Sequence, residues 1–422
     1  YSAQNMDFEM PYDPVHACEN ILEPETHRFY SRFTEAIHAQ DAKASLELLA
    51  FQYHHVKENG ERVLLSVNGG YNEMMECETE AFTRADFERI AKTYADTAQA
   101  ALDCGFDMLL IHGGHGLCLS QFYSPVINKR DDEFGPQCLE NRMRFADMIL
   151  DAIRERVGRK LLIEYRISGS ECVPGGFEVD ECIEFFKIIQ DRIDIAHIST
   201  GAFYNGTENI THPTEFLPHG CNAKFAAAVK ADPRIKIPVL TLGAFQDADL
   251  IEQTLAEGKA DIIAMARGTI ADPYTVEKSR EGRPQDIVPC IKCFHCLDDC
   301  KKTHYYSCAV NPIAGRETQL DMLVPKEYEK QNVAIIGGGP GGMKTALLAA
   351  ERGHKVTLFE KEEKLGGQLN DADFMSFKYD LKNYKNYLID HVNASPAITV
   401  KLGHAVTPEE LTAMGFDEVI CA

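Results

Sequence analysis

Short apolar runs alternate with helical stretches between about residues 40 and 270, and this alternation limits the possible folds most strongly. The runs typical of strands are 44–49, 108–111, 161–165, 193–198, 237–242 and 261–265. Repeated strand–helix units form a parallel sheet, which is either open or closed into a (β/α)8 TIM barrel. A closed barrel needs eight strands, and six such runs are visible.

Three of the intervening stretches are predicted to be helices. Between residues 86 and 104, the side chains of Phe87, Ile90 and Tyr94 recur three or four positions apart and form one buried stripe. The spacing of Thr83 and Asp86 is that of a helix cap. Residues 139–157 follow the same periodicity, a further helix is expected over 26–40, and an extra strand over 62–67 within a long loop.

The two ends of the chain do not complete this pattern. Residues 1–40 offer a loop and one helix without a buried strand, so the first two barrel strands are expected upstream of Tyr1. The chain begins without methionine and stops inside the apolar run 418–422. We therefore expect a fragment, shortened at both ends.

Four cysteines follow the strand–helix region with the spacing C-x2-C-x2-C-x11-C. They are Cys290, Cys293, Cys296 and Cys308. Three thiolates two residues apart can surround one corner of a cubane, and a fourth from a returning segment completes a [4Fe-4S] site. Structural zinc is the main alternative, although zinc ribbons usually present two separated C-x2-C pairs; inert thiols are another. Cys300 is an alternative third ligand, but it lies further from Cys293 than Cys296 does.

A glycine-rich loop follows the apolar run 333–336. Its glycines include Gly337, Gly339 and Gly342, and a second strand ends at Glu360. In this context the glycines allow a tight turn in which a pyrophosphate approaches a helix N-terminus, and the acid takes the ribose hydroxyls. The pattern predicts a dinucleotide site; a glycine-rich turn without a ligand is the alternative.

The charge of the chain limits its partners. Net charge is −22 with a pI near 5.1, which disfavours binding to nucleic acid and to anionic membranes. No apolar run reaches the roughly 18 residues of a membrane-spanning helix. Cysteines outside the bunched run are scattered singly, so a reducing cytoplasm is favoured over a disulfide-rich compartment. The expected partner is a small-molecule substrate, with a homo-oligomer left open.

Two histidines stand at the end of the second visible barrel strand, in the run Ile-His-Gly-Gly-His-Gly. Catalytic groups of barrels lie at the carboxyl ends of strands, which places His112 and His115 in the active layer. Both can donate hydrogen bonds to one carbonyl oxygen and so polarise a conjugated C=C bond. A metal pair or a structural histidine is the alternative interpretation.

The stretch IHGGHGLCLSQFYSPVINKRDDEFGPQCLENRMRF closely resembles the FMN-barrel signature of the old yellow enzyme superfamily. In its order of barrel, cysteines and glycine loop, the whole chain resembles the long iron–sulfur flavoprotein branch. That branch includes 2,4-dienoyl-CoA reductase, clostridial 2-enoate reductases, bile-acid-inducible flavin oxidoreductases and trimethylamine dehydrogenase. The resemblance implies an FMN barrel over 1–280, a cluster segment over 281–328 and the start of a Rossmann-like FAD/NAD(P) domain over 329–422. It also implies FMN, FAD and a [4Fe-4S] cluster as cofactors, with NAD(P)H as co-substrate.

The resemblance assigns roles to individual residues. His112 and His115 resemble the pair that holds the substrate carbonyl, and Arg166 resembles the arginine over the flavin N1/O2 edge, where a cation stabilises reduced flavin. Glu47 stands where many members have a flavin-contacting glutamine. The residues that resemble the FMN phosphate site are Gly243, Ala266 and Arg267, with a structural role as the alternative for Arg267. Those that resemble a second FAD-contacting turn are Gly366, Gly367 and Gln368.

One position departs from the family pattern. Many reductases of the family have a tyrosine two residues after the second histidine as proton donor, and here that position is Leu117. Protonation would then come from Tyr123, Tyr165 or water. The sequence thus favours an NAD(P)H-dependent oxidoreductase that reduces an activated C=C bond of an α,β-unsaturated carbonyl or enoyl-CoA-type substrate. An oxidative amine dehydrogenase and a non-catalytic electron-transfer subunit are the alternatives.

Overall fold

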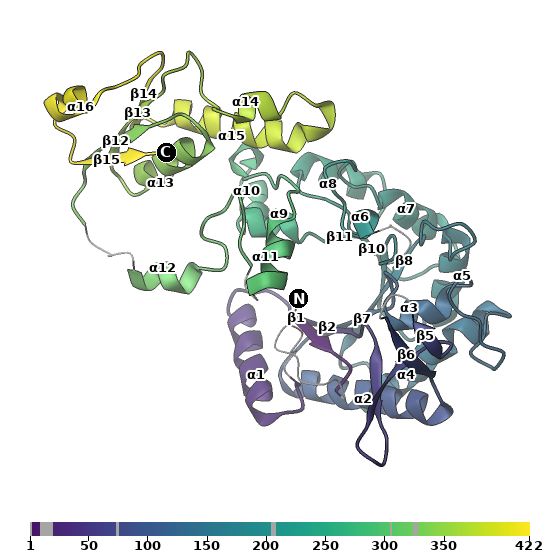
Figure 1. The fold of residues 1–422 in the computed structure, drawn as a ribbon. Helices are drawn as coiled ribbons and strands as arrows, with labels where there is room; N and C mark the ends of the chain where they lie inside the picture. The colour runs from purple at the N-terminus through teal and green to yellow at the C-terminus, as the bar shows by residue number, and fades with distance from the viewer. Residues whose placement is uncertain (1, 9–19, 73–75, 204–207, 304–305, 324–327) are drawn as a thin grey trace. The chain divides into compact units, whose positions relative to one another are not determined.

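The computed structural model describes residues 1–422 except 1, 9–19, 73–75, 204–207, 304–305 and 324–327. The chain divides into two compact units (Figure 1). Unit 1 comprises Tyr1–Pro213, His219–Phe245 and Asp249–Ala264, and unit 2 comprises Thr214–Pro218, Gln246–Ala248 and Met265–Ala422. Among the described residues, no helix combines the length and apolar character needed to cross a bilayer.

Unit 1 is built on a seven-stranded parallel sheet. Its order is β1 (Ser2–Asn5), β2 (Ser45–Leu49), β7 (Met108–His112), β8 (Leu162–Ser168), β9 (Ile195–Ser199), β10 (Val239–Thr241) and β11 (Ile262–Ile263). In Figure 1 the helices of this unit surround the strands, as in a TIM barrel. The principal helices are α1 (Pro24–His38), α2 (Arg84–Asp103), α4 (Leu139–Val157), α5 (Val179–Ile189), α7 (Ala223–Ala231) and α8 (Ala248–Ala256). The six expected strands and three expected helices are all present.

The expectation that residues 1–40 contain no strand was wrong. Strand β1 pairs in parallel with β2, with Ser2 opposite Leu46 and Asn5 opposite Leu49. The described sheet therefore has seven of the eight strands of a closed barrel, not six. The sequence of β1 is polar, and its Gln4 side chain is fully buried, where Oε1 accepts a hydrogen bond from the Ile21 amide at 2.9 Å. An apolar-run criterion fails on such a strand because a side-chain partner replaces hydrophobic burial.

Local sequence explains the helices that cover this sheet. Thr83 and Asp86 form a reciprocal capping box at the start of α2, as predicted. Phe87 on α2 packs edge-to-face on Phe145 of α4, with ring centroids 4.8 Å apart. The long β2–α2 connection contains a second sheet, ordered β3 (Tyr53–Val56), β4 (Arg62–Ser66), β6 (Cys77–Ala81) and β5 (Gly70–Asn72). The strand expected over 62–67 is thus β4.

Unit 2 begins with short helices and ends in a Rossmann-like domain. The first elements are α9 (Arg267–Ala271), α10 (Thr275–Arg280), α11 (His295–Thr303) and α12 (Glu317–Leu323). A four-stranded parallel sheet follows, ordered β14 (Ile398–Lys401), β13 (Lys355–Phe359), β12 (Asn332–Ile336) and β15 (Glu418–Cys421). Its helices are α13 (Pro340–Glu351), α14 (Leu369–Ala372), α15 (Tyr379–Ala394) and α16 (Pro408–Met414). The strand–glycine turn–helix–strand unit predicted around residues 331–360 is β12–α13–β13.

Candidate active site and cofactor sites

The two predicted active-site histidines lie together at the end of β7. His112 is the last residue of the strand, and its Nε2 lies 2.7 Å from Nδ1 of His115. Both side chains are buried, and His115 has a left-handed backbone with φ 64°. The Ser168 hydroxyl oxygen holds this turn by accepting a hydrogen bond from the His115 amide at 3.1 Å. The rule that catalytic groups of barrels lie at the carboxyl ends of strands therefore identified two side chains that are in contact.

Glu47 and Arg166 extend the histidine pair toward the neighbouring strands. Oε1 of Glu47 on β2 lies 2.7 Å from Nδ1 of His112 and 3.6 Å from the Arg166 guanidinium on β8. Burial alone would raise the pKa of Glu47, but the close His112 ring and the charge of Arg166 lower it to about 2. Glu47 is therefore an anion at neutral pH. Three residues assigned from family resemblance thus share one polar network with His115.

The network ends at a residue that the sequence reasoning missed. Nε2 of His115 lies 2.6 Å from the Ser199 hydroxyl, and Ser199 is the last residue of β9. Burial, with the positive charge of Arg166, lowers the pKa of His115 well below its ordinary value, and burial lowers the pKa of His112. Both rings are neutral at pH 7 as a result. Ser199 ends its strand as His112 ends β7, so the same strand-end rule offered the signal.

A second buried pair lies on the same strands. Nδ1 of His197 on β9 contacts the Glu164 carboxylate on β8, and both residues are nearly inaccessible to solvent. Nε2 of His197 has no hydrogen-bond partner among the described residues. A buried polar atom without a partner costs free energy unless a ligand or water satisfies it. Together with the Arg166 cation, these polar groups suit the polar edge of a flavin, which is the chemistry predicted for Arg166.

The groups considered as replacement proton donors are also buried. The hydroxyls of Tyr123 and Tyr165 contact each other, and burial raises the pKa of both phenols. Leu117 is 3% exposed and precedes α3 (Cys118–Tyr123). A Cβ at Gly113 would come within 2.7 Å of the Tyr165 ring, so the glycine allows the strand end to pass that ring. Which group protonates the substrate stays a prediction.

The residues predicted to hold the FMN phosphate fall in different units. Gly243 follows β10 in unit 1, whereas Ala266 and Arg267 begin α9 in unit 2. Beside Gly243 lies the Asn222 side chain, whose Nδ2 is buried and without a hydrogen-bond partner among the described residues. A buried amide donor next to this glycine fits an anionic oxygen. The Arg267 guanidinium lies over the Phe294 ring, 5.0 Å from its centroid, so the phosphate role of Arg267 stays a prediction.

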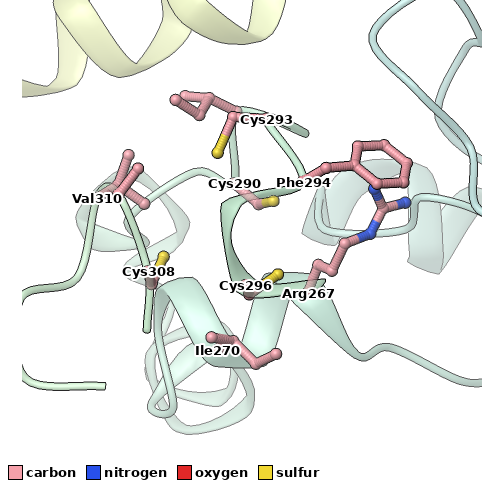
Figure 2. Close-up of a pocket in the computed structure, with 10 residues that line it drawn as sticks. Arg267, Ile270, Cys290, Cys293, Phe294, Cys296, Cys308 and Val310 are labelled. Atoms are coloured by element: carbon pink, nitrogen blue, oxygen red, sulfur yellow. The ribbon is translucent and has the colours of Figure 1, made fainter. Parts of the chain in front are cut away.

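The four predicted cluster ligands line one small pocket in unit 2. Cys290, Cys293, Cys296 and Cys308 surround it together with Arg267, and Figure 2 shows their sulfur atoms around a common space. Cys296 lies on α11, and Cys300 stands one turn further along the same helix but does not line the pocket. The choice of third ligand made from sequence spacing thus agrees with the geometry of the pocket.

The backbone of the cysteine loop is shaped around these thiols. Lys292 and Phe294, which flank Cys293, both have left-handed φ values of 51° and 63°. The amide of Lys292 donates a hydrogen bond to the Cys290 sulfur at 3.4 Å. Amide donors to sulfur stabilise a thiolate and tune a bound cluster. In the described part of the chain, no group of three or more His, Cys, Asp or Glu side chains is already arranged to hold a metal ion. The cluster therefore stays a prediction, which rests on the cysteine spacing and on the four thiols that line one pocket.

A buried ion pair anchors the same loop to the nucleotide-binding region of unit 2. Nζ of Lys292 lies 2.9 Å from Oδ2 of Asp380 on α15, and both side chains are almost inaccessible. It also donates hydrogen bonds to the Leu217 carbonyl at 2.8 Å and to the Tyr379 hydroxyl at 3.2 Å. Gln246 donates to Oδ1 of Asp380 and accepts from the Cys290 amide. Sequence reasoning missed this contact because it joins residues 88 positions apart.

The predicted nucleotide-binding residues line one open cleft of about 1340 Å3. They are Gly337, Gly339, Gly342, Glu360, Gly367 and Gln368. A Cβ at Gly342 would come within 1.9 Å of the Gly337 carbonyl oxygen, whereas one at Gly339 or Gly341 would meet no atom within 4 Å. The turn therefore needs glycine at 342 and leaves open space above the start of α13, where a pyrophosphate would lie. Glu360 accepts hydrogen bonds from the Gly338 amide at 2.7 Å and the Glu362 amide at 2.9 Å.

Comparison with known proteins identifies the class to which this fold and site belong. The family model for the NADH:flavin oxidoreductase / NADH oxidase family matches residues 19–286, and a model for an NAD(P)-binding Rossmann-like domain matches 335–390. The chain belongs to the NADH:flavin oxidoreductase / NADH oxidase family. The resemblance to the iron–sulfur branch of the old yellow enzyme superfamily, which the sequence predicted, is confirmed.

Relatives of known activity show how the chain compares with whole enzymes. It is 31% identical over 99% of its length to an NADH oxidase of Thermoanaerobacter brockii, and 30% identical over 93% to a cinnamate reductase of Clostridium sporogenes. Its fold matches a solved 2-naphthoyl-CoA reductase with a TM-score of 0.89 and 25% identity over the whole chain. It spans 64%, 61% and 65% of these proteins, so it is similar to about two thirds or less of each.

Proposed function

We propose that this chain forms the FMN barrel, cluster segment and first part of the FAD domain of an NAD(P)H-dependent reductase. Its substrate would be an activated C=C bond of an α,β-unsaturated carbonyl or enoyl-CoA-type compound. The observation that carries the proposal is the combination, in one chain, of a buried cationic and histidine-rich strand-end site, a four-cysteine pocket and a dinucleotide cleft. The names of the cinnamate and 2-naphthoyl-CoA reductases support the reductive direction.

Each group of residues would have one role in this reaction. Bound flavin supplies hydride transfer to the activated carbon. Arg166 would lie against the flavin and favour its anionic reduced form. Gly243 and Asn222 would hold its phosphate end through a backbone turn and an amide donor. His115, held by His112 and Ser199, would orient the substrate, because its ring can exchange one hydrogen-bond partner for another.

One observation favours a second candidate function, the oxidation of an amine. Three of the four ring nitrogens are hydrogen-bonded to the other ring or to Ser199, and the fourth, Nδ1 of His112, lies 2.7 Å from the Glu47 carboxylate without forming a hydrogen bond. Neither ring therefore presents a spare N–H group to a carbonyl in this arrangement. A neutral histidine with its lone pair toward the substrate suits an N–H or O–H group, as an oxidised substrate would offer.

Anaerobic turnover by the full-length enzyme distinguishes the two functions. NADH or NADPH should reduce the flavins, and cinnamate should reoxidise them while the saturated acid hydrocinnamate does not. In the His112→Ala, His115→Ala double variant, reoxidation should slow by roughly 100-fold because the substrate loses the ring that orients it, while reduction by NAD(P)H stays near normal. Reduction of the flavins by dimethylamine, with no reoxidation by cinnamate, would instead support the amine dehydrogenase.

A further inference from the structure

The residues Glu47, His112, His115 and Ser199 follow one another in a row of polar contacts, which we call the histidine chain. Glu47 stands at one end of it, and its carboxylate can only accept hydrogen bonds. An ionised carboxylate has no proton to donate. Its Oε1 lies 2.7 Å from Nδ1 of His112, a distance at which two lone pairs would repel, so Nδ1 must carry the proton. The low pKa of Glu47, about 2, keeps the carboxylate ionised at neutral pH. The carboxylate therefore fixes the tautomer of the first ring.

The tautomer of His112 fixes that of His115. A neutral imidazole has one N–H donor and one acceptor nitrogen, so protonated Nδ1 leaves Nε2 of His112 as an acceptor. Nε2 lies 2.7 Å from Nδ1 of His115, which must then be the donor. Nε2 of His115 is left with its lone pair and accepts from the Ser199 hydroxyl at 2.6 Å. With this assignment, the two hydrogen bonds of the chain, from Ser199 to His115 and from His115 to His112, both point toward Glu47, whose Oε1 faces Nδ1 of His112 in an ion-pair contact.

We propose that Glu47 is a positioning residue that makes His115 an acceptor, so that the site selects a substrate group carrying an N–H or O–H donor. A glutamine at this position could instead donate its amide hydrogen to Nδ1 of His112. That reversal would propagate, leaving Nε2 of His115 protonated and able to donate to a carbonyl oxygen. The proposal rests on the proposed flavin site, and the donor group that it selects is the group expected of an oxidised substrate, as in the second candidate function.

Two probes with the same aromatic ring test the direction of the hydrogen bonds along the histidine chain. Benzyl alcohol can donate to Nε2 of His115, whereas benzaldehyde offers only lone pairs. Their dissociation constants are measured from the change in flavin absorption of the oxidised full-length enzyme without NAD(P)H, so no turnover is needed. We expect the wild-type protein to bind benzyl alcohol at least about 10-fold tighter than benzaldehyde, and Glu47→Gln to lower that ratio by about 10-fold or more. An unchanged ratio in Glu47→Gln overturns the proposal.

A matched variant and a second substitution separate this effect from damage to the fold. Asp107→Asn makes the same carboxylate-to-amide change 2.8 Å from a ring nitrogen of His38, just before the start of β7, and it should leave the probe ratio unchanged. Ser199→Ala removes the internal donor, so benzyl alcohol should bind more tightly. If benzaldehyde gains affinity in Ser199→Ala instead, His115 is a donor and the proposal fails. Flavin reduction by NADH or NADPH in the same preparations tests the proposed flavin site separately, because that half-reaction does not involve the histidine chain.

Discussion

The buried pair of Lys292 and Asp380 makes the stability of the cysteine loop testable. The two charges lie 2.9 Å apart with side chains only 2% and 1% exposed. Removing one partner of such a pair leaves a buried charge and costs about 3–5 kcal/mol, whereas replacing both is often close to neutral. We therefore expect Lys292→Met to destabilise unit 2 by about 3–5 kcal/mol, and the Lys292→Met, Asp380→Leu double variant to recover most of that loss.

Urea unfolding followed by circular dichroism measures this coupling, and iron content reports cluster retention. Because Lys292 lies between two proposed ligands, the single variant should also lose iron on dialysis while the double variant retains more. The control is Lys302→Met, which breaks the exposed Lys302–Asp298 pair on α11 and should change neither reading measurably. If the Lys292→Met and Asp380→Leu losses simply add in the double variant, the pair is not the anchor inferred from the structure.

Three further predictions concern single sites. Gly342→Ala should abolish FAD binding because its Cβ would clash with the Gly337 carbonyl, whereas Gly341→Ala has open space and should bind FAD normally. The FAD released from each purified variant measures this, and equal amounts from the two variants would contradict the prediction. The pKa of Glu47 is depressed in the folded state, so its stabilisation is present above about pH 4.5 and is lost toward pH 2. Unfolding free energies of wild type and Glu47→Gln should therefore converge by about 3 kcal/mol across that window, and parallel curves would refute the ion pair. Cys296→Ser should lose the cluster and Cys300→Ser should retain it, as measured by iron and sulfide analysis, and the reverse result would exchange the two ligands.

Local sequence patterns predicted most of the fold because its main elements bury apolar side chains with regular periodicity. Helices α2 and α4 and the central strands follow this rule directly. Strand β1 does not, because the buried side chain of Gln4 is satisfied by a hydrogen bond with the backbone of Ile21, 17 positions away. The periodicity of apolar residues along the sequence does not show that a polar side chain will find such a partner in the fold.

The candidate site divides in the same way. Strand ends and cysteine spacing identified His112, His115 and the four thiols, because each is marked by its own local motif. Ser199 ends β9, but only the folded structure shows that it meets His115, and no local motif marks the Lys292 anchor, which depends on which segments become neighbours. The direction of the hydrogen bonds along the histidine chain was even harder to predict from the sequence. It depends on Glu47 being ionised, which follows from the balance of burial and charge in the folded protein.

The cofactor content of the full-length protein, purified without oxygen, tests the central claim most directly. Flavin extraction should release about one FMN and one FAD per chain, and acid treatment should release about four iron and four sulfide. That result would place a flavin barrel, a cubane cluster and a dinucleotide domain in one polypeptide. Zinc without sulfide, or protein that folds normally but retains no FMN, would contradict the account.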